Sequence, residues 1–233
     1  MDNKLNSYGF GNRTTVTDVV VRNRVLRNTY WLLAISMIPT VLGAWIGVAT
    51  GFSFVAGSPG LSLILFLGIA FAFFYGIEKT KNSGMGVVLL LAFTFFMGLM
   101  LSRLVTSVLQ FSNGPALIMY AFGGTAAVFG AMATIATVSK RDFSGLGKFL
   151  FVGVILLILA SVANIWLQLP ALMVTVSVIA IGIFSAYMLF DVQRVVNGGE
   201  TNYVTATLAI YLDVYNVFTN LLALLGIFGG NRD

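Results

Sequence analysis

The chain has 233 residues, of which 58% are hydrophobic and only 9% are charged, whereas roughly 25% are charged in ordinary soluble domains. Too little polar surface is available to cover a water-soluble globule, so we expect an all-α polytopic membrane protein. The chain contains no cysteine and no histidine, which excludes disulfides, Cys/His metal sites, thiol nucleophiles and Ser-His-Asp triads. Its net charge of +5 would suit nucleic acid, but the basic residues are divided among connecting segments, so we expect no nucleic-acid partner.

The first 28 residues are polar and contain no apolar run. We therefore predict two parts, a polar cytoplasmic N-terminal tail of residues 1–28 and a seven-helix transmembrane domain of residues 29–233. The tail is expected to be mobile up to about Val19. Three arginines then form a basic collar next to the membrane: Arg22, Arg24 and Arg27.

Seven apolar segments follow, each close to the ~20 residues that a membrane-spanning helix needs. Short polar connectors separate them, and short connectors make consecutive helices antiparallel neighbours in one bundle. The weakest boundary is the one before Pro170, where proline has to interrupt an otherwise continuous apolar stretch. The predicted spans are Tyr30–Thr50, Leu61–Ile77, Gly84–Leu109, Pro115–Val138, Phe149–Leu167, Ala171–Phe190 and Tyr203–Phe228.

The basic residues predict the orientation of the bundle. Apart from Arg103, inside a span, and Arg232, near the C-terminus, every lysine and arginine lies in the N-terminal segment or in the second, fourth or sixth connector. These segments share one side of the membrane, and basic residues are enriched on the cytoplasmic side. We therefore predict a multi-pass protein of the bacterial inner membrane, in contact with membrane lipid, with its N-terminus in the cytoplasm and its C-terminus in the periplasm.

Small residues allow membrane helices to approach each other closely. The fourth predicted span carries Gly123, Ala127 and Ala131 at four-residue spacing, which predicts a helix contact there. In the last span, small and polar residues spaced by three and four positions fall on one face, which argues against exposure of this face to lipid. They are Ala206, Ala209, Asp213, Asn216 and Asn220.

Two aspartates, Asp191 and Asp213, are the strongest candidates for a functional site, because an ionisable side chain inside a membrane costs several kcal/mol unless it is paired or hydrated. They lie roughly 9 and 16 Å from the turn between the last two spans at ~1.5 Å per residue, so tilt or a kink could bring them together. Such a pair would share a proton or hold a cation, with Asn216 and Asn220 as supporting polar groups. Alternatively, Asp191 pairs with Arg194 and Asp213 stays protonated against Asn216.

Arg103 has two interpretations as well: it serves as the counter-ion of an aspartate, or its side chain extends to the nearer membrane interface. Enzymatic activity is not expected. An intramembrane aspartyl protease would also use two carboxylates, but the chain contains no Gly-x-Gly-Asp sequence.

From Val25 to the C-terminus the chain resembles the Bax inhibitor-1 family, and within it the bacterial YccA-type branch. The most specific matches are GGTAAVF from Gly123, ANIWLQLPAL from Ala163 and GGETNYVTATLAIYLDVYN from Gly198. The resemblance implies a seven-helix bundle in which the other helices surround the last one. It also implies modulation of the membrane-anchored protease FtsH, which would then be a partner.

Ion-conducting members of this family behave as pH-sensitive calcium leaks, governed by an aspartate pair in the last two spans that Asp191 and Asp213 match. Their pattern has an arginine in the second span that holds one aspartate; the second span here has none, so Arg103 or Arg194 would have to replace it. No cofactor is expected beyond weakly bound calcium at Asp191 and Asp213, since carboxylates suit this ion.

Overall fold

The structure, a computed structural model, describes residues 16–52 and 59–231. These residues form seven helices and no strand. Each helix is long and apolar enough to cross a membrane. The helices are α1 (Val16–Thr50), α2 (Pro59–Thr80), α3 (Gly84–Leu109), α4 (Gly114–Val138), α5 (Leu146–Leu167), α6 (Pro170–Val196) and α7 (Tyr203–Gly229). The predicted all-α fold with seven membrane-spanning helices is therefore confirmed.

The predicted span boundaries hold closely, with two informative differences. Helix α1 begins at Val16, well before the predicted start of the first span at Tyr30. The three arginines of the basic collar and residues 16–19 are therefore part of this helix. Helix α6 continues beyond Phe190 to Val196, which places Asp191 inside the helix. The predicted break before Pro170 is present: Gln168 adopts a left-handed conformation with φ of 51°, and Asn164 accepts a hydrogen bond from the Leu169 amide at 2.9 Å.

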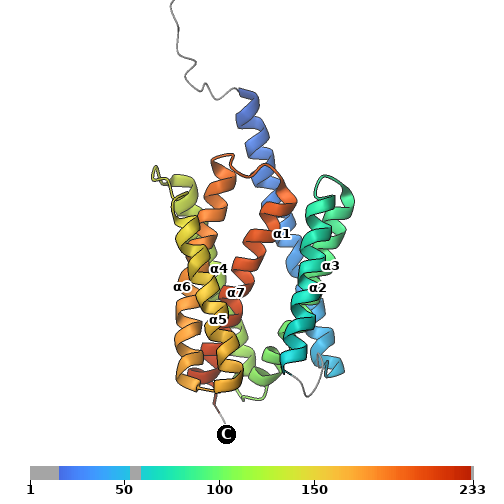
Figure 1. Cartoon of the computed structure of the whole chain (residues 1–233), viewed down its shortest axis with the longest axis vertical. Coiled ribbons are helices and arrows are strands. Elements are labelled where there is room, and N and C mark those ends of the chain that lie inside the picture. Colours follow the sequence, from blue (N-terminus) through green and yellow to red (C-terminus); the bar gives the residue numbers. More distant parts are fainter. Residues whose placement is uncertain (1–15, 53–58, 232–233) are drawn as a thin grey trace, which may run out of the picture.

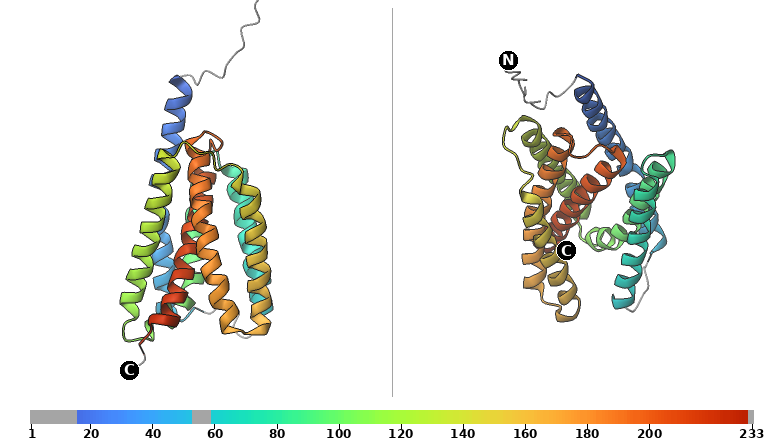
Figure 2. Two further views of the ribbon diagram at one scale, coloured as in Figure 1. Left: turned by 90° about the vertical axis from the view of Figure 1, so that its left-hand side faces the viewer. Right: turned by 45° about the horizontal axis from the view of Figure 1, so that its top comes forward.

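Helix α7 lies in the middle of the bundle, as expected from the family resemblance. In Figure 1 it runs between a group formed by α4, α5 and α6 and a group formed by α1, α2 and α3, and the tilted view of Figure 2 shows the same central position. It packs against α1, α3, α4, α6 and, less extensively, α2. No residue from Tyr203 to Gly226 is exposed. The bundle thus shields almost the whole length of α7 from lipid.

One end of the bundle, here called the basic end, holds the start of α1 and the connectors at residues 81–83, 139–145 and 197–202. Side chains tie these connectors together. The Asn202 amide donates to the Lys81 carbonyl at 3.1 Å, which joins the α6–α7 connector to the α2–α3 connector. Gln193 donates to the Arg141 carbonyl and accepts from the Phe143 amide, both at 2.7 Å, which fixes the α4–α5 connector to α6.

The closest helix contact joins α1 and α3. It does not involve the small residues of α4, where the sequence had predicted a close contact. A Cβ built on Gly43 would lie 2.2 Å from the Phe95 carbonyl oxygen, and one on Gly98 would lie 2.1 Å from the Thr40 carbonyl oxygen. Gly123, in contrast, has nothing within 4 Å of such a Cβ, and Ala127 and Ala131 are exposed. The prediction of a helix contact along that stripe is therefore wrong for the described part of the chain.

The contact between α1 and α3 predicts a specific sensitivity to a single methyl group. Gly98→Ala should lower the thermal unfolding temperature of the purified protein in detergent, because overpacking against backbone costs about 1–3 kcal/mol. Gly130→Ala is the matched control, since nothing lies within 4 Å of a Cβ there and alanine favours a helix by about 1 kcal/mol over glycine. Equal unfolding temperatures for the two variants would contradict the close packing described above.

Candidate functional site

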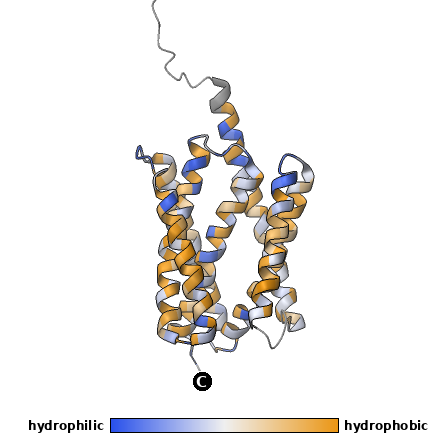
Figure 3. Cartoon of the chain, viewed as in Figure 1, coloured by the Kyte–Doolittle hydropathy of each residue, from blue (hydrophilic) through white to orange (hydrophobic). Residues whose placement is uncertain are grey.

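The candidate site lies where the interior of the bundle is most polar. In Figure 3, hydrophilic segments interrupt α7 partway along its length, although apolar helices surround it. Asp213, the eleventh residue of α7, is only 4% exposed. It sits on a face of α7 that turns towards α6, and the extensive packing between α6 and α7 brings the two helices alongside each other there. The position excludes the lipid-facing alternative for Asp213.

Asp191 and Asp213 meet in this interior. Their side chains lie within hydrogen-bonding range of each other, so the extension of α6 to Val196 and its packing on α7 remove the difference in depth that the sequence implied. A hydrogen bond between two carboxyl groups needs a proton on one of them. The Oδ2 atom of Asp213 is buried and accepts no hydrogen bond from a donor group among the described residues. Such an atom is an acceptor available to a proton, a water molecule or a cation.

Arg194 does not replace Asp213 as the partner of Asp191. Its guanidinium lies 3.7 Å from Glu200, in the connector that follows α6. The positive charge of Arg194 still acts on Asp191 at a distance, and the negative charge of Glu200 opposes it. The alternative in which Asp191 pairs with Arg194 alone therefore does not describe this structure, and Arg194 stabilises the end of α6 next to the aspartate pair.

Asn216 and Asn220 follow Asp213 along α7, but their amide groups bond within the helix. The Asn216 side chain donates to the Leu212 carbonyl at 2.8 Å, and that of Asn220 donates to the Asn216 carbonyl at 2.8 Å. The alternative in which Asp213 is hydrogen-bonded to Asn216 therefore does not describe this structure. Both amides keep their oxygens as potential ligands on the same stretch of the helix, while each nitrogen uses one of its two N–H groups within the helix.

Arg103 lies apart from the aspartates. The Tyr215 hydroxyl donates to the Met97 carbonyl at 3.1 Å, which fixes the level of α7 relative to α3. Arg103 is six residues farther along α3, about 9 Å beyond that level at 1.5 Å per residue and away from the basic end. Its side chain is exposed, and none of the ion pairs found among the described residues involves it. The counter-ion interpretation of Arg103 thus has no support in this arrangement.

Several polar side chains close to the pair in the sequence or in space were not predicted as part of the site. Tyr187, on α6, lies within electrostatic range of both aspartates. Tyr211 is fully buried and shares a hydrogen bond of 2.9 Å with Thr40 of α1. Gln193, two positions after Asp191, anchors the α4–α5 connector as described above. The spacing of Tyr211 and Tyr215 on either side of Asp213 was the available signal, since tyrosines near a buried aspartate indicate a polar interior.

A tight metal site would need more ligands than the pair offers. Calcium takes six to eight oxygen ligands, and no group of three or more acidic, histidine or cysteine side chains comes together in the described residues. Two carboxylates with neighbouring amide oxygens could hold a cation only with water completing its shell. The chemistry that the site allows is therefore reversible proton exchange or weak, hydrated cation binding.

Comparison with known proteins identifies the family to which this chain belongs. Residues 22–230 match the family model described as inhibitor of apoptosis-promoting Bax1. The chain is 36% identical to the modulator of FtsH protease YccA of Escherichia coli K12, over 90% of this chain and 93% of that protein. The same protein in another Escherichia coli strain is named an inner membrane protein. An uncharacterized membrane protein of Vibrio cholerae is 34% identical over 97% of this chain and the full length of that protein. This chain is thus a multi-pass membrane protein that belongs to the Bax inhibitor-1 family, with YccA among its relatives.

Proposed function

We propose that this protein binds an FtsH-type protease in the bacterial inner membrane and modulates its activity, without itself catalysing a reaction. The observation that carries the proposal is the similarity to a relative named as a modulator of FtsH, which extends over 90% of this chain and 93% of the relative. The family model also matches residues 22–230, which include all seven helices apart from the first turns of α1.

The basic end supplies physical support for this proposal. With the N-terminus in the cytoplasm, this end faces the compartment in which an ATP-driven protease takes hold of its membrane substrates. Helix α1 continues past the other helices at this end (Figure 1). Residues 1–15, which lie outside the described residues, precede it and are polar. Chain termini are common sites at which proteases engage a protein.

Interaction with the protease is the direct test. The full-length protein should co-purify with FtsH in mild detergent, and its overexpression should slow the turnover of a known FtsH membrane substrate. Deletion of residues 2–15 should weaken this effect at least severalfold while the bundle stays folded, as judged by its helical content. Absence of co-purification, together with unchanged substrate turnover for both proteins, would overturn the proposal.

The proposed orientation has a separate test. A reporter active only in the cytoplasm should be active when fused to the N-terminus and inactive when fused to the C-terminus, because seven spans place the two ends on opposite sides. A reporter active only in the periplasm should give the reverse pattern and serves as the control. Cytoplasmic activity at both termini would contradict the orientation and the number of spans.

A second function, a pH-sensitive cation leak, is proposed on a different observation: the unpartnered Oδ2 atom of Asp213 beside Asp191. A permeating cation needs oxygen ligands that bind it weakly enough to release it, and this pair with Asn216 and Asn220 matches that need. Since the chain lacks histidine, a response to pH near neutrality would come from carboxyl groups. Protonation would remove the charge that attracts the cation.

The leak is testable in liposomes that contain the purified protein. Calcium flux should be higher at about pH 8 than at about pH 6, because the ionised pair attracts the cation. Asp213→Asn should abolish this difference and Asp191→Asn should alter it. Flux no greater than in empty liposomes, or a pH profile that the double variant leaves unchanged, would remove this function.

Asp142→Asn is the matched control for that experiment. Asp142 lies in the α4–α5 connector outside the spans, where the amide of Ser144 donates to it at 2.9 Å and the hydroxyl at 3.0 Å. These hydrogen bonds hold the pKa of Asp142 below its usual range. The carboxylate therefore stays ionised throughout the tested pH range, and its removal should leave the pH profile unchanged.

A further inference from the structure

Arg103 is a charged group without a charged partner in the part of the chain that the structure describes. The acidic residues of that part lie elsewhere: Asp18 is near the start of α1, Glu78, Asp142 and Glu200 are at the basic end, and the aspartate pair is nearer to that end than Arg103 is. An arginine within a span is costly unless its guanidinium is hydrated or paired. The described residues therefore place no acidic side chain at the level of Arg103.

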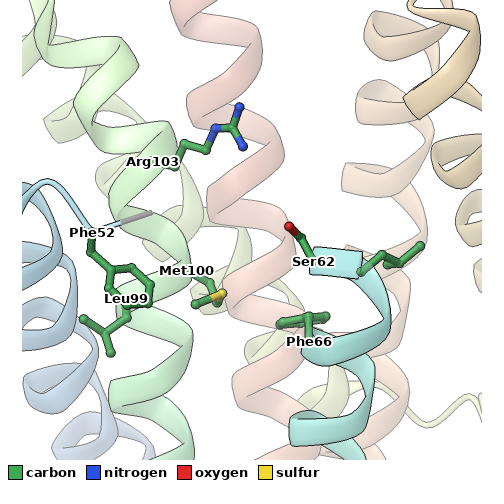
Figure 4. A pocket seen from close by; sticks show the side chains of 7 residues that line it. Phe52, Ser62, Phe66, Leu99, Met100 and Arg103 are labelled. Atoms are coloured by element: carbon green, nitrogen blue, oxygen red, sulfur yellow. The ribbon is translucent and has the colours of Figure 1, made fainter. Parts of the chain in front are cut away.

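Beside Arg103 is a cavity of about 240 Å³ between the end of α1, the first turns of α2 and the second half of α3. This volume is several times the ~30 Å³ that one water molecule occupies in the liquid. Figure 4 shows Arg103 on α3, with Ser62 and Phe66 on the facing helix α2 and Met100 one turn away from Arg103. The cavity therefore combines a positive charge with an apolar floor, and its remaining lining residues are Phe52, Leu63 and Leu99.

The position of the cavity matches the boundary between lipid headgroups and acyl chains. Arg103 is six residues before Leu109, the end of α3, and thus about 9 Å inside that end. Ser62 is three residues after the start of α2, at a similar level. The side chain of an arginine at this level reaches the headgroup region while its methylenes remain in apolar surroundings. On α2, Leu65 and Leu67 flank the face that lines the cavity, and they are 41% and 42% exposed.

We propose that this cavity is a binding site for one anionic phospholipid, whose phosphate pairs with Arg103 and whose acyl chains lie against the exposed apolar residues of α2. A guanidinium binds phosphate through two parallel hydrogen bonds, which gives both strength and orientation. The apolar floor and the adjacent exposed side chains favour a phosphate that carries hydrocarbon over free inorganic phosphate. The site is independent of the proposed protease partner and of the aspartate pair.

To test this proposal, the purified full-length protein is titrated with phosphatidylglycerol or with phosphatidylethanolamine, and the number of bound lipids is measured by native mass spectrometry. The unmodified protein should hold one phosphatidylglycerol in preference to phosphatidylethanolamine. Arg103→Gln should weaken the binding of this lipid about tenfold, as expected for the loss of a charge-assisted contact. Millimolar inorganic phosphate should not displace it.

Two further variants keep the result specific to the cavity. Arg24→Gln removes an equal charge from an exposed position at the basic end and should leave the binding unchanged. Met100→Trp fills the cavity but retains Arg103, and should weaken the binding as Arg103→Gln does; it also tests the cavity if Arg103→Gln fails to fold. Equal losses with Arg103→Gln and Arg24→Gln, full binding by Met100→Trp, or displacement by phosphate would each overturn the proposal.

Discussion

The constraint on which this structure depends is the exclusion of a carboxyl group from hydrocarbon. A helix that carries an aspartate halfway along its length cannot face lipid at that level without a large free-energy penalty. Asp213 is such a residue, and the bundle meets the constraint by placing α7 inside a ring of other helices. Since no residue from Tyr203 to Gly226 is exposed, the helices around α7 provide an interior in which polar groups can be satisfied. Hydroxyls of Tyr211 and Tyr215 use that interior to bond to α1 and α3.

The meeting of the two aspartates follows from how the α6–α7 hairpin is held. Asn202 begins α7 by accepting hydrogen bonds from the amides of Val204 and Thr205, and its own amide group joins the α2–α3 connector. Gln193 fastens the end of α6 to the α4–α5 connector. The register of α6 against α7 is therefore fixed at the basic end, a few residues from Asp191. A carboxyl pair that exchanges a proton or a cation needs such a fixed register to keep its oxygens in contact.

Much of this fold could be predicted from the sequence, because length and hydropathy determine a membrane helix almost locally. The bounds of α3 were predicted to the residue, and the aspartates were identified because each of the two apolar runs that flank the last turn carries one of them. The helix contacts could not be predicted in the same way. Gly43 and Gly47 on α1 and Gly123 with its small neighbours on α4 are equivalent patterns, but only the first pair meets a facing helix at close range. Which small stripe is covered depends on packing between distant segments, which no local pattern contains.

A charged side chain inside a membrane has a free-energy cost. Asp191, Asp213 and Arg103 lie well inside the spans, and the structure accommodates each of them differently according to its depth. Asp213 is the deepest and is buried against another carboxyl group. Asp191 is closer to the basic end, where the charges of Arg194 and Glu200 also act on it. Arg103 lies towards the opposite end and is exposed, so it depends on what surrounds the bundle rather than on the bundle itself. The interior groups are thus separated from lipid by a layer of apolar helices, whereas Arg103 is exposed at the surface of the bundle. In the functions proposed above, the part that responds to pH is therefore separate from the part that binds lipid.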